Sequence, residues 1–533
     1  MATGRAGTTI FGPEGFSYFG ERVAAIGDVN DDGVADFAVA ARQAGNAFSD
    51  PAGDSLDQVG VVYVVYGRDG AELPEVIDFG FDTAAAPDGT TFSVIQGAAA
   101  GDWLGWSLSA AGDLNGDGID DLVAGSDRMG DPTNDGGAVV IYGKAGGLDP
   151  VIPVESLTAD QGARLNGRES AQAGLAVSGA GDLDGDGVDD LVVESQNDSR
   201  RYVVFGSDAE ALPAEAVLGT DLGARTLTIT GVGASGGGAV GDVTGDGVAD
   251  LVIPSGGDLL VFEGGAGLAA LGRGTVDLAD LTPFATIADG RGFAFGDAGD
   301  VNGDGVGDLV VDGAVVFGGA ALSGATVDLA ALDGSDGFRF APGGVNFNVG
   351  GGGDVNGDGI GDLVLGSRNQ AGEDGGVGFG RTYLVFGRTG GFPADLDLEA
   401  LDGTDGYRID GTFERDFLDG GVLADVNGDG FADVIAGAWR FNRPDPAGGR
   451  PDFDRGGAFV IYGGAGRLAA FDAADGAGDG RLSPLALDAE LEFEEGEPGG
   501  GGGGGGPTDG PDDLTLSAPG TLAGGGGSDT LGG

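Results

Sequence analysis

The chain has 533 residues, of which 118 are glycine, and its formal net charge is −62. It contains neither cysteine nor histidine, which excludes disulfides, thiolate nucleophiles and histidine-based general-base or transition-metal chemistry. So acidic a protein is not expected to bind nucleic acid or an anionic membrane directly, and no apolar run in the sequence approaches the length of a membrane span.

Seven copies of a nine-residue pattern, Asp-x-(Asn/Asp/Thr)-x-Asp-Gly-x-x-Asp, follow one another along the chain. The copies begin at Asp28, Asp113, Asp182, Asp242, Asp300, Asp354 and Asp425. Alternate side chains of such a loop can point at one centre, as in the first half of an EF-hand loop, and glycine at position 6 permits the sharp turn. An EF-hand would continue with Glu at position 12 and flanking helices. Here β-type runs such as DLVAGS start at position 9, so each loop is predicted to join two strands.

The predicted ligands occupy positions 1, 3, 5, 7 and 9, with the backbone carbonyl acting at position 7. They are Asp28, Asn30, Asp32, Val34, Asp36, Asp113, Asn115, Asp117, Ile119, Asp121, Asp182, Asp184, Asp186, Val188, Asp190, Asp242, Thr244, Asp246, Val248, Asp250, Asp300, Asn302, Asp304, Val306, Asp308, Asp354, Asn356, Asp358, Ile360, Asp362, Asp425, Asn427, Asp429, Phe431 and Asp433. An all-oxygen set favours Ca²⁺ over Mg²⁺ or Zn²⁺, so about seven Ca²⁺ ions are predicted. Turn formation alone, the alternative, would not require one register in seven copies. Thr244 predicts a weaker fourth site, and Asp184 gives the third copy the most charge.

The loops belong to a larger repeat. A small-residue strand precedes each loop, an apolar run usually ending in aromatic-Gly follows its strand, and a fourth strand such as TLTITG precedes most cycles. Four short strands in units of about 54 to 85 residues are typical of a β-propeller. The predicted fold is therefore all-β, a seven-bladed propeller of four-stranded antiparallel blades with a calcium loop between strands A and B of every blade.

The repeat resembles the FG-GAP repeat of the integrin α-subunit propeller. Phe19-Gly20, Leu104-Gly105, the seven loops and strand ends such as AGA at 436–438 carry the likeness, which covers roughly residues 8–465. The resemblance implies seven blades, with cations on the face opposite the ligand-binding face. Integrins carry the cation motif in only some blades, so this chain is more similar to a bacterial or otherwise free-standing relative.

The two ends of the chain carry further signals. We predict a propeller at residues 1–470, a closing or extension segment at 471–496, a Gly-rich flexible linker at 497–523 and the start of an RTX-like repeat at 524–533. Residues 524–532 fit the RTX nonapeptide G-G-x-G-x-D-x-U-x, which implies a fragment of a longer protein exported by a type I system. Either residues 8–11 or residues 481–493 could provide the strand that closes the ring.

Long B–C loops predict where a ligand would bind. They occur in blades 1, 2, 6 and 7, at residues 41–58, 127–136, 368–381 and 438–456, and these blades are neighbours in a ring. Arginine and aromatic residues, which are enriched at binding hot spots, concentrate there. The candidate ligand face comprises Arg42, Arg128, Arg368, Arg381, Trp439, Arg440, Arg443 and Phe453. Tolerated surface loops are the alternative, and Trp103 and Trp106 are more typical of blade packing than of a ligand platform.

These features predict a calcium-stabilised, extracellular or cell-surface protein-interaction and adhesion module of a secreted RTX-type bacterial protein. The expected partner is a protein or glycan on a cell surface or matrix, and the fragment is expected to be monomeric. A glycan-binding lectin-like propeller is one alternative, but no aromatic recurs on the loops of every blade. A non-catalytic accessory domain of a larger secreted enzyme is another. The carboxylates outside the loops form no specific catalytic constellation, so the chain itself is not predicted to be an enzyme and no catalytic residue is assigned.

Overall fold

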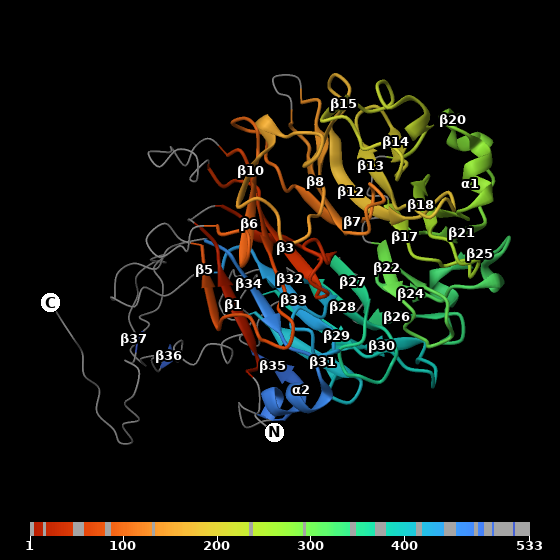
Figure 1. Ribbon diagram of the computed structural model, residues 1–533. Helices are drawn as coiled ribbons and strands as arrows, with labels where there is room; N and C mark the ends of the chain where they lie inside the picture. The colour runs from red at the N-terminus through yellow and green to blue at the C-terminus, as the bar shows by residue number, and fades with distance from the viewer. Residues whose placement is uncertain are drawn as a thin grey trace, which may run out of the picture.

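The computed structural model is a ring of seven β-sheets (Figure 1). It describes residues 5–13, 17–45, 58–79, 87–129, 134–233, 238–290, 295–341, 348–367, 380–411, 418–441, 455–473, 478–483, 493–494 and 515–516. Each sheet has five strands, and neighbouring sheets are arranged around a common axis as propeller blades. The seven-bladed all-β propeller predicted from the sequence is therefore confirmed.

The strands fall into five layers from the axis outward, named A to E here. Layer A contains β2 (Phe19–Gly27), β7 (Ser107–Gly112), β12 (Ala173–Gly181), β17 (Gly238–Val240), β22 (Phe295–Gly299), β27 (Asn348–Gly353) and β32 (Leu418–Ala424). Layer B contains β3 (Asp36–Ala41), β8 (Asp121–Ser126), β13 (Asp190–Ser195), β18 (Asp250–Ser255), β23 (Asp308–Val311), β28 (Asp362–Ser367) and β33 (Asp433–Ala438). Layer C contains β4 (Val61–Val65), β9 (Gly137–Ile141), β14 (Arg200–Val204), β19 (Asp258–Phe262), β24 (Ala314–Val316), β29 (Arg381–Val385) and β34 (Gly457–Ile461).

The two outer layers complete each blade. Layer D contains β6 (Phe92–Gln96), β11 (Gly162–Asn166), β16 (Thr226–Thr230), β21 (Ala285–Ala288), β26 (Gly337–Ala341), β31 (Gly406–Asp410) and β1 (Gly7–Phe11). Layer E contains β10 (Val151–Pro153), β15 (Glu215–Val217), β20 (Gly274–Asp277), β25 (Thr326–Asp328), β30 (Asp395–Asp397), β35 (Arg481–Leu482) and β5 (Val76–Asp78). Short helices follow some strands: α1 (Ala266–Leu271), α2 (Ala465–Asp472), η1 (Val154–Ser156), η2 (Gly223–Arg225), η3 (Leu278–Asp280), η4 (Ala320–Leu322), η5 (Leu329–Ala331) and η6 (Leu398–Ala400). A separate antiparallel pair joins β36 (Phe493–Glu494) to β37 (Thr515–Leu516).

The fifth strand of each blade was not predicted. Layers A to D pair antiparallel, whereas the strand of layer E pairs parallel to layer D, as β10 does with β6. Most of these strands come from the C–D connection of the following blade, as β5 does, and they cover the outer edge of layer D. An uncovered edge would present unpaired backbone groups to other chains. Segments of two to four residues are too short to show a period of two in the sequence.

The N-terminal strand closes the ring, which confirms residues 8–11 over residues 481–493 as the closing strand. In Figure 1 the red β1 lies beside the blue β34, and the two pair antiparallel from Gly7↔Ile461 to Phe11↔Gly457. The side chains of Thr8 and Tyr462 share a hydrogen bond of 2.9 Å. The competing segment begins with β35, which instead pairs with β31 as the outer strand of blade 6, while residues 484–492 lie outside the described residues.

The core lies between the blades. Strands of layer B are buried on both faces, which explains their continuous apolar runs. Phe37 and Tyr63 of blade 1, for example, belong to one buried cluster with Ile435 and Val460 of blade 7. Layer A uses glycine, alanine and serine because neighbouring A strands contact one another around the axis. A side chain at Gly351, for instance, would collide with the carbonyl oxygen of Ala298 in the preceding blade.

The predicted linker at 497–523 lies outside the described residues except for β37, and the RTX-like stretch at 524–533 lies entirely outside them. Within the described residues, no helix has the length and apolar character needed to cross a membrane.

Candidate functional site

The seven acidic loops join layers A and B and share one backbone conformation. In every loop the position-1 carboxylate accepts the N–H of position 6 at 2.7 or 2.8 Å. It also accepts the N–H of position 5 at 2.9 to 3.1 Å. The glycines at position 6, from Gly33 to Gly430, have φ between 87 and 93°, a left-handed conformation that a side chain would strain. The carboxylate thus folds the loop around itself, and glycine makes that fold possible.

The aspartate at position 9 anchors each loop to its own blade. Its carboxylate accepts the N–H of position 2 and the N–H of the glycine that follows strand C, as Asp36 does from Val29 at 3.1 Å and from Gly67 at 2.8 Å. The same pair of bonds recurs in all seven blades. This contact explains the glycine that follows strand C in every blade, since that glycine approaches the loop backbone closely.

Burial dominates the electrostatics of position 9. These seven aspartates are at most 1% exposed. Loss of hydration raises the pKa of Asp250 to about 6 and those of Asp308 and Asp362 to about 7. It raises the pKa values of Asp36, Asp121, Asp190 and Asp433 to about 8. A nearby divalent cation would reverse this effect, because it favours the ionised carboxylate.

Every loop is also bonded to the next blade in the ring. The residue after the strand-C glycine donates its N–H to the position-2 carbonyl of the preceding blade's loop, at 2.7 to 3.1 Å. The seven donor–acceptor pairs are Arg68 to Val426, Lys144 to Val29, Ser207 to Leu114, Gly265 to Leu183, Gly319 to Val243, Arg388 to Val301 and Gly464 to Val355. Position 2 is a fully buried apolar residue in all seven loops. The loops are therefore part of the blade-to-blade interface as well as turns within a blade.

Each loop is folded by backbone hydrogen bonds to its position-1 and position-9 carboxylates, and among the described residues three carboxylates of one loop converge only in the third loop. The donors of the predicted ligand residues are carboxylate, amide, hydroxyl and carbonyl oxygens, the chemistry that suits a hard cation. In blade 3, carboxylate oxygens of Asp182, Asp184 and Asp190 lie within 4.8 Å of one another. In blade 1, Asn30 is 6% exposed and its Oδ1 has no hydrogen-bond partner. This buried oxygen is therefore available as a ligand for a cation. The residues present fit a divalent cation.

The side chain at position 7 contributes little to the core. Apart from Val34 it is only half-buried, and in each blade it packs on the strand-C glycine. Position 2 supplies the core contact instead. Thr244, at position 3 of the fourth loop, is buried with its hydroxyl 3.4 Å from carboxylate oxygens of both Asp242 and Asp250.

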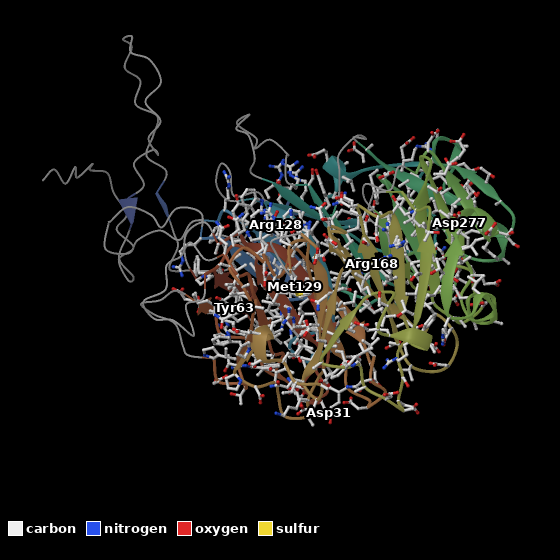
Figure 2. The ribbon with its side chains drawn as sticks, turned by 90° about the horizontal axis from the view of Figure 1, so that it is seen from above. Asp31, Tyr63, Arg128, Met129, Arg168 and Asp277 are labelled. Atoms are coloured by element: carbon white, nitrogen blue, oxygen red, sulfur yellow. The ribbon has the colours of Figure 1, made fainter. Side chains whose placement is uncertain are left out.

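The opposite face carries a stack of arginine and aromatic side chains, called the arginine–aromatic ladder here. It comprises Arg128, Trp103, Trp106, Arg42, Tyr18, Trp439 and Arg440, from blades 7, 1 and 2. Tyr18 and Trp439 stack at 4.9 Å and 6°, and Trp103 and Trp106 stack at 6.0 Å and 8°. Figure 2 shows Asp31, in the first acidic loop, at the edge of the ring away from Arg128.

Arginine guanidinium groups fill the ladder. Arg42 lies 4.6 Å from the ring centroids of both Tyr18 and Trp106, and its guanidinium donates to the carboxylate of Glu21. Arg128 lies 3.7 Å from the centroid of Trp103 and makes no ion pair with any side chain of the described residues. All members of the ladder are partly exposed. The ladder thus combines blade-to-blade contacts with side chains that a partner can reach.

Four of the eight predicted ligand-face residues join this ladder: Arg42, Arg128, Trp439 and Arg440. Arg381 does not, since it is buried in blade 6 and forms ion pairs with the more exposed carboxylates of Glu399 and Asp410. Arg368, Arg443 and Phe453 lie outside the described residues.

Tyr18 was not named from the sequence as part of the candidate ligand face, although its position in the repeat could have indicated it. It precedes Phe19-Gly20 as Trp103 precedes Leu104-Gly105, and both residues have φ of 58°. Such left-handed, non-glycine residues are uncommon and concentrate at functional positions. The shared conformation gives Tyr18 and Trp103 equivalent places at the starts of two blades.

The comparisons with known proteins agree with this geometry. Residues 104–142 match the FG-GAP repeat. The matched FG-GAP repeat contains β7, the second acidic loop, β8 and β9. The chain is also similar to integrin α-6 of Gallus gallus, at 37% identity over 102 residues, which cover 18% of this chain and 8% of the integrin. It is 32% identical to integrin α-5 of Xenopus laevis over 180 residues, which cover 33% of this chain and 14% of that protein.

Each match therefore spans only a small part of the integrin. Among solved structures, the WD40 domain of Toxoplasma gondii coronin aligns at 10% identity over 67% of this chain and 70% of the coronin chain, with a TM-score of 0.34.

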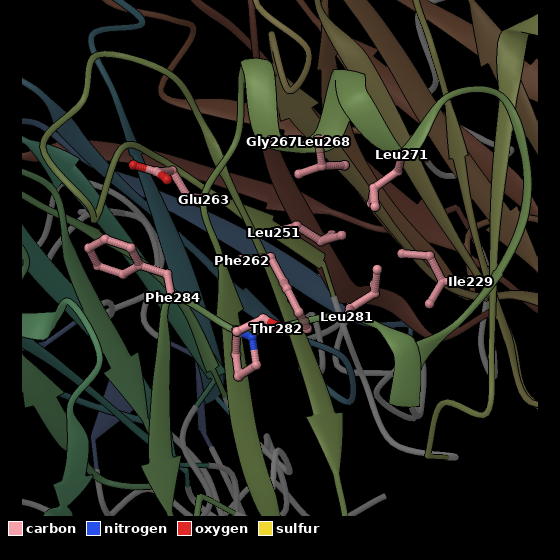
Figure 3. Close-up of a pocket in the computed structure, with 11 residues that line it drawn as sticks. Ile229, Leu251, Phe262, Glu263, Gly267, Leu268, Leu271, Leu281, Thr282 and Phe284 are labelled. Carbon is pink, nitrogen blue, oxygen red and sulfur yellow. The ribbon is translucent and has the colours of Figure 1, made fainter.

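One apolar pocket lies beside α1. Figure 3 shows its lining, which includes Leu251, Phe262, Leu268 and Leu271 with Glu263 as the lone carboxylate. Its volume of about 200 Å³ is below the range of ordinary small-molecule sites, and it contains no pair of titratable groups for acid–base chemistry.

Proposed function

We propose that this chain is a calcium-stabilised, extracellular β-propeller that acts as a protein-interaction and adhesion module. The observation that carries the proposal is the recurrence of one loop geometry in all seven blades, with each loop hydrogen-bonded to the next blade. A cation bound in such a loop would hold both the loop and the interface. About seven Ca²⁺ ions would bind, through positions 1, 3, 5, 7 and 9 of each loop.

The similarity to integrin α chains supports the interaction role. Calcium near millimolar levels outside cells would fill weak sites, which cytosolic levels would not. We place the protein in a secreted RTX-type bacterial context because residues 524–532 resemble the RTX nonapeptide, with export by a type I system. The proposed organisation is a propeller at 1–470, an extension at 471–496, a linker at 497–523 and the start of an RTX-like repeat at 524–533.

Thermal unfolding of metal-free protein tests the calcium part. Circular dichroism would follow melting as Ca²⁺ is titrated to millimolar levels, with Mg²⁺ as the control. We expect Ca²⁺ to raise the melting temperature by on the order of 10 °C, because several sites bind only the folded state. A curve that does not respond to Ca²⁺, in protein shown by metal analysis to be free of ions, would exclude calcium stabilisation.

The ladder is the surface that we propose for the partner. Labelled wild-type protein and the Arg128→Ala variant would be tested in Ca²⁺ against immobilised extracellular-matrix proteins and a glycan array. Arg168→Ala is the matched control, because Arg168 is exposed in the D–A connection at the same end of blade 3. Loss of protein binding in Arg128→Ala alone supports the proposal. Binding to glycans only would favour a lectin, and unchanged binding in Arg128→Ala would remove the ladder from the contact surface.

A further inference from the structure

In two of the seven acidic loops a predicted cation ligand forms an ion pair with an arginine from another part of the chain. Arg273 pairs with Asp184 in the third loop, and Arg467 pairs with Asp429 in the seventh. In the other five loops, all of which the structure describes, no arginine or lysine forms an ion pair with positions 1, 3, 5 or 9. The loops share one backbone geometry, so these arginines are what distinguishes two of them.

The third loop contains the more enclosed of the two pairs. Nη2 of Arg273 lies 2.5 Å from Oδ2 of Asp184, whose side chain is 4% exposed. The guanidinium also lies 3.4 Å from the ring centroid of Phe205, which precedes the glycine bonded to Asp190. Arg273 reaches the loop from the segment between α1 and β20, which belongs to the following repeat. Stacking and ion pairing together hold the positive charge against the loop.

In the seventh loop the arginine comes from a helix. Arg467, in α2, donates from Nη1 to Oδ2 of Asp429 at 3.0 Å and lies 3.7 Å from a carboxylate oxygen of Glu72. Together with Arg5 and Asn427, these residues line a polar cavity of about 330 Å³ where the first and last blades meet. A cation in the seventh loop would therefore lie near the positive charge of Arg467, which also pairs with Glu72 of the first repeat.

Charge decides what these arginines do to cation binding. The third loop has carboxylates at all four side-chain positions, whereas most loops have an amide at position 3. The extra carboxylate alone would make the third site the tightest. A guanidinium on Asp184 cancels that advantage, because a carboxylate oxygen held by arginine must be released before it can face a cation, and two positive charges repel each other at short range.

We propose that Arg273 and Arg467 are built-in competitors of the cation, which make the third and seventh loops fill at higher Ca²⁺ concentration than they otherwise would. In the metal-free protein the same arginines act as counter-ions and stabilise these loops. This inference rests on the proposed calcium function. It assigns a cation-linked movement to the Arg273 and Arg467 side chains, which leave the ligand carboxylates when the loops are filled.

Site-resolved hydrogen exchange tests the competition. Mass spectrometry of the full chain would follow peptides covering residues 182–190 and 300–308 through a Ca²⁺ titration of wild type and of Arg273→Met. We expect the midpoint of protection at 182–190 to fall by about threefold or more, as removal of an ion pair on a buried carboxylate allows, and that at 300–308 to stay unchanged. In parallel, Arg273→Met is expected to lower the melting temperature of metal-free protein, which gives effects of opposite sign with and without Ca²⁺.

The chain offers a matched control. Arg388 pairs with Asp405 and lies 4.4 Å from the ring centroid of Phe392, so it has the same combination of contacts away from any loop carboxylate. Arg388→Met keeps the backbone N–H that residue 388 donates to the carbonyl of Val301, and it is expected to leave the midpoint at 182–190 where it is. Arg467→Met repeats the test on residues 425–433 should Arg273→Met fail to fold.

The outcomes separate the two proposals. An unchanged or raised midpoint at 182–190 in Arg273→Met, in protein whose fifth loop still responds to Ca²⁺, overturns the competition and leaves calcium binding in place. If no loop peptide of the wild type responds to Ca²⁺, calcium binding fails and the competition fails with it.

Discussion

The two faces of the ring have diverged to different degrees. On one face seven loops keep the same hydrogen bonds to within a few tenths of an ångström, and all seven are bonded to a neighbouring blade. On the other face the B–C connections range from a tight turn at residues 256–257 to long insertions, and within the described residues three blades contribute to the arginine–aromatic ladder. Both faces contain charged side chains, but only one of them repeats.

This difference shows how function can be divided in a repeat fold. A propeller blade is stabilised by its neighbours, so a loop that joins two blades contributes to stability in every blade. A partner needs one binding site, so residues that contact it are needed only on the blades that form that site. We therefore assign the repeated acidic face to stability and the uneven face to recognition, and the following predictions test that assignment.

The largest effect should come from pH in the absence of cations. The position-9 aspartates have folded-state pKa values raised to about 6, 7 or 8, above the value of 3.8 for an unperturbed Asp. The folded state therefore holds protons that the unfolded state releases, and stability falls as pH rises from about 4 through 8. We expect metal-free protein to melt on the order of 10 °C lower at about pH 9 than at about pH 5.5. In saturating Ca²⁺ this slope should disappear, and a slope that is equal with and without Ca²⁺ would contradict a cation beside these carboxylates.

Pairs of loop variants should reveal the contact between blades. Asp113→Ala and Asp182→Ala affect adjacent loops, which Ser207 connects by donating to the carbonyl of Leu114. We expect the double variant in Ca²⁺ to lose about 0.5 to 3 kcal/mol more unfolding free energy than the sum of the single variants, since the two loops share an interface and contacting sites are not additive. The matched pair Asp113→Ala and Asp354→Ala, in blades 2 and 6, should be additive. Additive losses of unfolding free energy for both pairs would show that the loops act independently.

Ladder variants should change stability less than loop variants. Trp439→Ala removes the stack on Tyr18, and such aromatic contacts contribute about 0.5 to 1.5 kcal/mol beyond the area they bury. We expect a fall in melting temperature of a few degrees at most in Ca²⁺, smaller than that of Asp182→Ala measured under the same conditions. A larger fall in the melting temperature of Trp439→Ala would indicate that the ladder serves mainly to hold the blades together.

The smallest effect should come from the fourth loop. Thr244 provides a hydroxyl where most loops provide an amide oxygen, and a hydroxyl is the poorer ligand. Thr244→Asn is expected to lower the Ca²⁺ concentration that half-protects residues 242–250 from hydrogen exchange by about twofold to threefold, equivalent to less than about 1 kcal/mol. An unchanged midpoint would indicate that position 3 contributes little to the site.

Much of the fold could be predicted because the same turn and strand-start residues recur at fixed positions in every repeat. Asp at position 9 begins every B strand, and glycine at position 6 has the left-handed conformation in every loop. The number of blades follows directly from these residues. The outer E strands could not be predicted, because a strand such as Val76–Asp78 is defined by a neighbouring blade and not by its own pattern.

The candidate sites divide in the same way. Asp28 and its equivalents could be named from the sequence because the residues of each loop are local, and a nine-residue spacing determines which side chains can meet. The counter-ions could not be named, since Arg273 lies 89 residues from Asp184 and Arg467 lies 38 residues from Asp429. The same holds for Tyr18 and Trp439, which come from opposite ends of the chain and stack only because the ring closes.

The sequence by itself therefore determined the class of fold, the number of blades and the positions of the acidic loops, since each depends on short-range patterns of charge, glycine and apolar residues. The tertiary structure alone decided which strand closes the ring, which arginines face a loop and which aromatics form the ladder. Those contacts join residues that are distant along the chain, and they form only when packing between blades brings them within a few ångströms of one another.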